Sequence, residues 1–131
     1  MDRAAIEAAL RDFLTSERQG IVAAYLFGSV ARGTPRGDSD VDVAVLFEVP
    51  PPATLEGLPC RLEDDLTDLV KAPVEVVALN TAPPDLVHRV LRDGRLLVDN
   101  DPSRRIRFEV RARNEFFDLE PILSRYRGTS R

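Results

Sequence analysis

Two carboxylates and a Gly-Ser pair form the pattern in this sequence that is best suited to chemistry. Gly28-Ser29 ends an apolar run, and after ten further residues Asp40-Val41-Asp42 opens a second one. Side chains at positions i and i+2 of a strand point to the same face, so Asp40 and Asp42 would repel each other unless a cation lies between them. Mg²⁺ prefers such oxygen ligands and usually keeps a nucleotide's phosphates in its coordination shell. Because a Gly-Ser turn offers N–H groups and a hydroxyl to phosphate oxygens, the pattern predicts a metal-nucleotide site.

A third carboxylate comes from Glu75, which lies between valines in the apolar stretch 73–79. We interpret Glu75 as a charge in a buried strand, where an unpaired carboxylate is costly and therefore needs a reason. If this strand neighbours the strand that carries Asp40 and Asp42, the three carboxylates converge. Such a group could bind two metal ions and accept the proton of an attacking hydroxyl, as phosphoryl or nucleotidyl transfer requires.

The elements that would position these residues follow from hydrophobic periodicity. The pattern predicts strands over 21–27, 40–48 and 73–79, with a short edge strand over 96–98. The first two strands could pair antiparallel or lie side by side. Helices are predicted over 4–18, 54–70 and 83–92, and a short helical turn over 30–32. These elements predict an α/β (α+β) fold, a small mixed β-sheet flanked by helices, as a single domain over 1–131 with 128–131 frayed.

The last predicted helix starts with Asp101 as its cap and Pro102 at its first position. It is expected to reach Phe117, or to continue with a kink before Pro121. Its apolar positions Ile106, Val110 and Phe117 lie beside Phe108 and Phe116, which predicts a broad apolar face.

Composition limits the partners and the compartment. The net charge of −4 lacks the basic excess of duplex-binding proteins, so we expect no direct nucleic-acid binding. Residues 104–131 differ, with eight arginines against four acidic residues, and predict either a solvated helix face or a contact with an acidic partner or RNA. Cys60 is the only cysteine, which excludes an intrachain disulfide. With no membrane-length apolar span and no signal peptide, a cytoplasmic protein is expected.

The Gly-Ser, ten residues, Asp-x-Asp pattern resembles the nucleotidyltransferase superfamily that includes DNA polymerase beta and the aminoglycoside nucleotidyltransferases. The segments Phe27–Gly33 and Ser39–Val45 look closest to the minimal nucleotidyltransferase (MNT) antitoxins, the partners of HEPN-domain toxins. The strand Val74–Leu79 and the later segment 91–97 are also similar, and the resemblance covers roughly residues 5–120.

The resemblance implies the nucleotidyltransferase fold and an adenylyltransferase that uses ATP and Mg²⁺. Asp40, Asp42 and Glu75 would then be the catalytic and metal-binding residues. Gly28, Ser29 and Arg32 would bind the nucleotide. Family members transfer AMP to a tyrosine hydroxyl of a HEPN toxin, so the expected partner is such a toxin in a hetero-oligomer. The family usually has Asp at the third acidic position, and Glu moves that carboxylate by about 1.5 Å.

Two other functions remain open. A non-catalytic antitoxin that neutralises its partner by binding is favoured by the Glu75 departure and by the apolar, Arg-rich last helix. A small-molecule nucleotidyltransferase of the aminoglycoside type would share the same motif, but such enzymes usually carry an additional domain that holds the acceptor.

Overall fold

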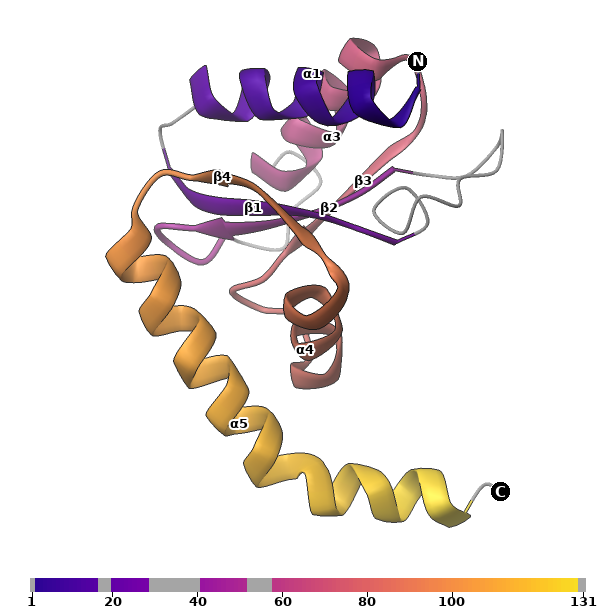
Figure 1. Ribbon diagram of the computed structural model, residues 1–131, viewed down its shortest axis with the longest axis vertical. Coiled ribbons are helices and arrows are strands. Elements are labelled where there is room, and N and C mark those ends of the chain that lie inside the picture. The colour runs from indigo at the N-terminus through magenta and orange to yellow at the C-terminus, as the bar shows by residue number, and fades with distance from the viewer. Residues whose placement is uncertain (1, 17–19, 29–40, 52–57, 130–131) are drawn as a thin grey trace.

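The fold is a four-stranded mixed sheet with two helices on each face, in a computed structural model that describes residues 2–16, 20–28, 41–51 and 58–129. For residues 58 and 119–129 only the backbone is described. Helices α1 and α3 cover one face of the sheet, and α4 and α5 cover the other (Figure 1). The predicted architecture is therefore confirmed. Within the described residues, no helix is long and apolar enough to cross a membrane.

The strand order in the sheet is β3-β2-β1-β4. Strand β1 pairs antiparallel with both β2 and β4, whereas β2 pairs parallel with β3. A parallel pair needs a crossover connection, which α3 supplies between β2 and β3. The bounds in chain order are α1 Arg3–Ser16, β1 Ile21–Phe27, β2 Val41–Phe47, α3 Leu58–Val70, β3 Val74–Ala78, α4 Pro84–Asp93, β4 Arg95–Asp99 and α5 Pro102–Thr129.

These bounds agree with the predicted elements, and β4 is an edge strand as expected. The open question of β1 and β2 is decided in favour of antiparallel pairing. The predicted turn over 30–32 and the start of the helix predicted from residue 54 lie outside the described residues. Of the residues expected to fray, 128–129 belong to α5, and 130–131 lie outside the described part.

Alternation along β2 divides the core into two layers. Val41, Val43 and Val45 pack under α1 and α3, together with Leu10 and Leu66. Ala44 and Leu46 point to the opposite face and pack against the α4 and α5 side. Six of the seven β2 side chains are buried, and Asp42 alone is half-buried. The sequence of a strand that is buried on both faces is a continuous apolar run. The one polar side chain in β2, Asp42, therefore indicates where the strand is not fully covered.

The free edge of β3 is closed by side chains from α3. The Val76 N–H donates to Glu63 Oε1 at 2.9 Å, and the Val74 N–H donates to Thr67 Oγ1 at 3.1 Å. An uncovered strand edge is a template for pairing with another chain. The polar side of α3 therefore satisfies backbone donors of the edge strand as well as facing solvent.

Helix α5 crosses the outer side of the α4 layer and changes direction in its second half (Figure 1), as expected for Pro121 within a helix. Asp101 caps it by accepting a hydrogen bond from the Arg104 N–H at 3.3 Å. The predicted apolar face is divided. Phe108 packs inward, and Phe116 stacks on His88 of α4 with ring centroids 3.7 Å apart. The expectation of one broad apolar face was wrong, because Ile106, Val110 and Phe117 are exposed.

Candidate active site

Asp42 and Glu75 lie directly opposite each other in the parallel ladder of β2 and β3. Their neighbours Val41, Val43 and Val76 belong to the core under α1 and α3, so both carboxylates point to the α4 and α5 side. The prediction that the two strands are neighbours is confirmed. Glu75 is exposed, however, so the interpretation of a charge within a buried strand was wrong. An exposed carboxylate needs no buried partner and remains accessible to a ligand.

Gly28 follows β1 and lies against Asp42. Phe27 is the register partner of Asp42 in the antiparallel ladder, which brings the end of β1 to this carboxylate. Gly28 has a φ of 78°, and a Cβ at this position would collide with Asp42 Oδ2. Both the left-handed backbone and the close approach require a residue without a side chain. The absence of a side chain at residue 28 therefore lets the Asp42 carboxylate lie directly against the backbone at the end of β1.

The remaining predicted site residues, Ser29, Arg32 and Asp40, lie outside the described residues. The structure thus brings together Gly28, Asp42 and Glu75. In the described part of the chain, no three His, Cys, Asp or Glu side chains are close enough to hold a metal ion. The donors that are present nevertheless fit Mg²⁺ in chemical type, because two carboxylates stand at paired positions of adjacent strands and Mg²⁺ takes oxygen ligands.

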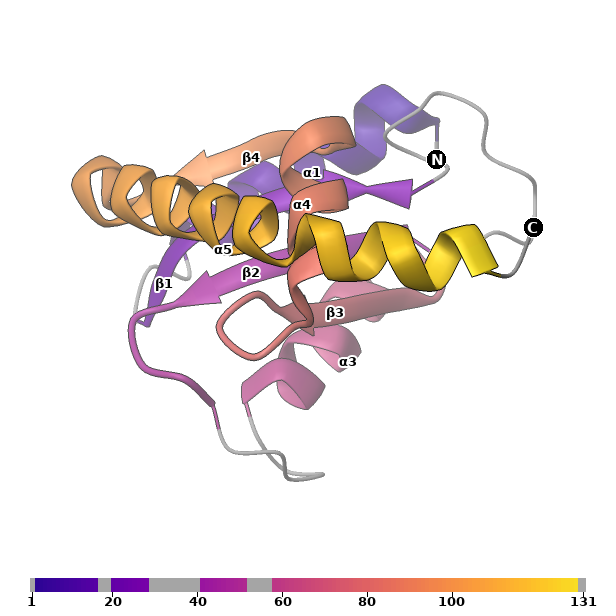
Figure 2. The ribbon, with the colours of Figure 1, turned by 90° about the horizontal axis from the view of Figure 1, so that it is seen from below.

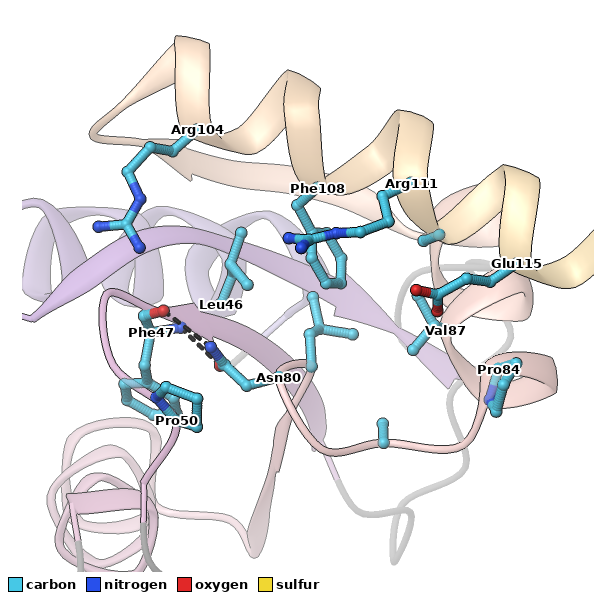
Figure 3. Close-up of a pocket in the computed structure, with 13 residues that line it drawn as sticks. Leu46, Phe47, Pro50, Asn80, Pro84, Val87, Arg104, Phe108, Arg111 and Glu115 are labelled. Atoms are coloured by element: carbon cyan, nitrogen blue, oxygen red, sulfur yellow. Dashed lines mark hydrogen bonds between the residues drawn. The ribbon is translucent and has the colours of Figure 1, made fainter.

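A cavity of about 340 Å³ lies on the same sheet face, at the other end of β2 (Figure 3). Leu46 at the cavity floor is four positions beyond Asp42 on β2, which corresponds to about 13 Å along a strand. The cavity is therefore distinct from the Asp42 end of the strand. Its lining residues come from β2, from the turn between β3 and α4, and from α4 and α5: Leu46, Phe47, Pro50, Leu79, Asn80, Ala82, Pro84, Val87, Arg104, Phe108, Arg111, Ala112 and Glu115.

Asn80 holds the wall of this cavity in place. Its Nδ2 donates to the Phe47 carbonyl, and its Oδ1 accepts from the Phe47 N–H, both at 2.9 Å. The two arginines of the cavity, Arg104 and Arg111, were not predicted as site residues. The only signal for them in the sequence is the arginine excess after residue 103, which identifies no single position.

A polar network fastens α5 to the sheet. The Tyr25 hydroxyl donates to Glu109 Oε1 at 2.6 Å, and Arg105 Nη1 donates to the same oxygen at 3.0 Å. Arg105 Nε also lies 3.0 Å from Asp99 Oδ1. Burial and the neighbouring Glu109 carboxylate raise the pKa of Tyr25 well above its ordinary value. The pairing with Asp99 raises the pKa of Arg105. Tyr25 is therefore both a core side chain and a hydrogen-bond donor to α5.

Comparison with known proteins points to one family. The family described as "Polymerase beta, Nucleotidyltransferase" matches residues 9–103. A solved structure described as a minimal nucleotidyltransferase is 38% identical, with a TM-score of 0.60, and the match covers 72% of this chain and 94% of that one. No curated protein matches the chain.

Two more distant structures share the fold over nearly the whole chain. One is a chain of a toxin–antitoxin crystallised with AMP-PNP, 22% identical with a TM-score of 0.72, covering 92% of this chain and 97% of that one. The other is from the tri-AMPylated Shewanella oneidensis HEPN toxin in complex with MNT antitoxin, 20% identical with a TM-score of 0.68, covering 95% and 98%.

Proposed function

The chain belongs to the polymerase-beta nucleotidyltransferase family, and from that premise we propose that it transfers AMP from ATP to a tyrosine hydroxyl of a HEPN-family toxin. It would thereby act as the antitoxin. The observation that carries the proposal is the convergence of Gly28, Asp42 and Glu75 at one end of the sheet. The two structural relatives that share its fold, one with AMP-PNP and one with an AMPylated HEPN toxin, support the choice of nucleotide and acceptor.

Each site residue has its own role in the proposed reaction. Gly28 lets the triphosphate approach the backbone, with Ser29 and Arg32 as further phosphate contacts. Asp40, Asp42 and Glu75 would hold Mg²⁺, which when bound offsets the negative charge of the reacting phosphates. Glu75 is exposed, so it can also accept the proton of the acceptor hydroxyl. The acceptor oxygen then bonds to the α-phosphorus of ATP, the bond from that phosphorus to the bridging oxygen breaks, and pyrophosphate leaves.

The extra methylene of Glu75 is compatible with this role. Because the side chain is exposed, it can rotate without displacing core residues, and the carboxylate can compensate for the added length. A buried glutamate at this position would have to displace its neighbours in the close-packed core instead.

Labelled ATP, with the label on the α-phosphate, tests the proposal. The protein is incubated with MgCl₂ and a purified HEPN-family toxin. We expect label on that protein, and its loss in Asp42→Asn, in Asp40→Asn and after removal of divalent ions. Asp64→Asn on α3 is the matched control, because Asp64 is an exposed carboxylate on the other side of the sheet. Undiminished labelling by Asp42→Asn contradicts the proposal, and label in a low-molecular-weight product would indicate a small-molecule acceptor instead.

A second candidate is an antitoxin that acts by binding alone. The exposed Ile106, Val110 and Phe117 on α5 favour it, because large apolar side chains on one helix suit a protein contact. It predicts that the Asp40→Asn, Asp42→Asn double variant still protects cells that produce the toxin. Loss of protection by a double variant that still folds would exclude it.

A further inference from the structure

The cavity between α5 and the turn that follows β3 has the walls of a preformed binding site. Its floor is the core layer of Leu46, Val87 and Phe108, and its volume of about 340 Å³ is near the lower end of the range for ligand pockets. The double hydrogen bond of Asn80 to Phe47 fixes one wall. The contacts of Arg105 fix the opposite wall, α5. A site whose walls are already held in place loses little entropy when a ligand binds.

The charged groups at this cavity select its ligand. Arg104 and Arg111 are both exposed, and Figure 3 shows them on the same stretch of α5, beside the cavity. Arg104 uses one N–H on the Glu48 carbonyl at 2.7 Å, which leaves its other donors available. Arg111 has no hydrogen bond or ion pair with any residue that the structure describes. Guanidinium groups above an apolar floor favour a carboxylate carried beside an apolar side chain.

Glu115 distinguishes a protein ligand from a nucleotide. Its carboxylate lines the same cavity and offsets part of the charge of Arg104 and Arg111, so the cavity suits a ligand with one carboxylate better than one with several phosphate charges. The exposed Ile106 and Val110 lie on the side of α5 opposite the cavity and are not part of it. The cavity, its apolar floor and its two arginines fit a protein segment that carries a carboxylate beside an apolar side chain.

The location links this partner to the reaction. Leu46 at the cavity floor and Asp42 project from the same face of β2, about 13 Å apart along the strand. A small protein spans that distance easily. We propose that the cavity docks an acidic and apolar segment of the protein acceptor, separate from the hydroxyl that reacts; this inference rests on the proposed function. Binding energy gained there holds the acceptor while its hydroxyl is presented at Asp42.

The experiment compares Arg104→Ala, Arg111→Ala and their double variant with the wild-type chain. Its control is Arg61→Ala, which removes an exposed arginine from α3 on the opposite face of the sheet. Calorimetry gives the Kd for the same HEPN-family toxin, and separately for MgATP. Labelling at varied acceptor concentration separates KM from kcat. Thermal denaturation verifies that each variant is folded.

We expect each single variant to raise the Kd and the KM for the acceptor about tenfold, and the double variant to raise both further. The kcat at saturating acceptor, and the Kd for MgATP, should stay within about twofold of wild type, since the docking site is apart from the reacting atoms. Arg111→Lys keeps the charge but not the planar donor pair, so it should fall between wild type and alanine.

Three results would overturn the docking proposal. They are an unchanged acceptor Kd in the folded double variant, a loss of MgATP affinity with acceptor affinity intact, and a wild-type chain that does not bind the acceptor at all. If the wild type binds the acceptor through these arginines but transfers no label, the docking site stands and the proposed AMP transfer fails.

Discussion

Gly28 and Asp42 constrain each other where β1 ends. The left-handed backbone at Gly28, with φ 78°, allows the Asp42 carboxylate to occupy the space in which a side chain would lie. Phe27, the register partner of Asp42, brings the two residues together through the ladder. The glycine therefore serves two purposes at once, as a turn residue and as the position that accommodates the Asp42 carboxylate.

Gly28→Ala should disturb both the left-handed turn and the position of the Asp42 carboxylate. The left-handed conformation costs an L-residue about 1–2 kcal/mol, and the added methyl group must also displace Asp42. We expect lower thermal stability together with a more than tenfold weaker affinity for MgATP, measured by calorimetry. Gly20→Ala is the matched control, because Gly20 has a similar φ of 84° at the opposite end of β1. It should lose stability and keep MgATP affinity. If Gly28→Ala binds MgATP as tightly as the control, the close approach of Gly28 to Asp42 is not needed for that site.

The site residues differ in how far the sequence could predict them. Asp42 and Glu75 were expected on neighbouring strands, and the register confirms this. The exposure of Glu75 could not be predicted from the sequence. β3 is an edge strand, and the alternation of its side chains does not tell whether helices cover both of its faces or only one. The position of Arg104 and Arg111 at the cavity could not be predicted either, since the fold brings them close to Asn80, which is far away in the sequence.

At the level of elements, α5 depends on a few polar contacts. Tyr25, Arg105 and Glu109 join it to β1, and Asp99 joins it to β4. The apolar run over 21–27 predicts that Tyr25 is buried, but it carries no information about a partner 84 residues away. The element bounds were predictable because periodicity is local. The division of α5 into an inward and an exposed apolar side was not, because it depends on where α4 packs.

The Tyr25 contact predicts a pH dependence of stability. In the unfolded chain the phenol ionises near pH 10. In the folded chain, burial and then Glu109 raise its pKa, so the folded state keeps the proton to higher pH. The stability from this group is therefore complete below about pH 10 and falls as the pH rises above that value, by up to about 1.4 kcal/mol per pH unit.

Tyr25→Phe removes this dependence. Urea unfolding at pH 8 and pH 11 should show a smaller loss of stability with pH in the variant than in wild type. At pH 8 the phenol is protonated in both states, so the difference there measures the lost hydrogen bond alone, about 1 kcal/mol. Equal losses of stability in both proteins between the two pH values would show that Tyr25 ionises as easily in the folded chain as in the unfolded one.

The whole molecule separates its charges. Residues 104–131 carry eight arginines and four acidic residues, while the full chain has a net charge of −4, so the rest of the chain is strongly acidic. Figure 2 shows that α5 forms an outer layer across the α4 side and continues past it. A basic helix lies on an acidic body, and an approaching protein meets a different charge on each side.

This separation makes a prediction for the rate of association with the acceptor. At about 0.1 M salt the Debye length is near 10 Å, so a partner at the α5 surface interacts with nearby arginines more than with the distant acidic residues. If the acceptor presents carboxylates there, attraction accelerates the encounter and is screened as salt increases. We expect the association rate constant, measured by stopped flow, to fall about fivefold between about 0.1 M and 0.5 M NaCl.

The Arg104→Ala, Arg111→Ala double variant provides the decisive comparison for this salt effect. It should associate more slowly at low salt and show a flatter dependence, because the charges that attract the partner are gone. Arg61→Ala should keep the wild-type slope, since Arg61 lies on the opposite side of the sheet. An association rate that rises with salt would mean that the net charge of −4 governs the encounter through repulsion. In that case the acceptor approaches the acidic body rather than α5, and steering by the arginines is excluded.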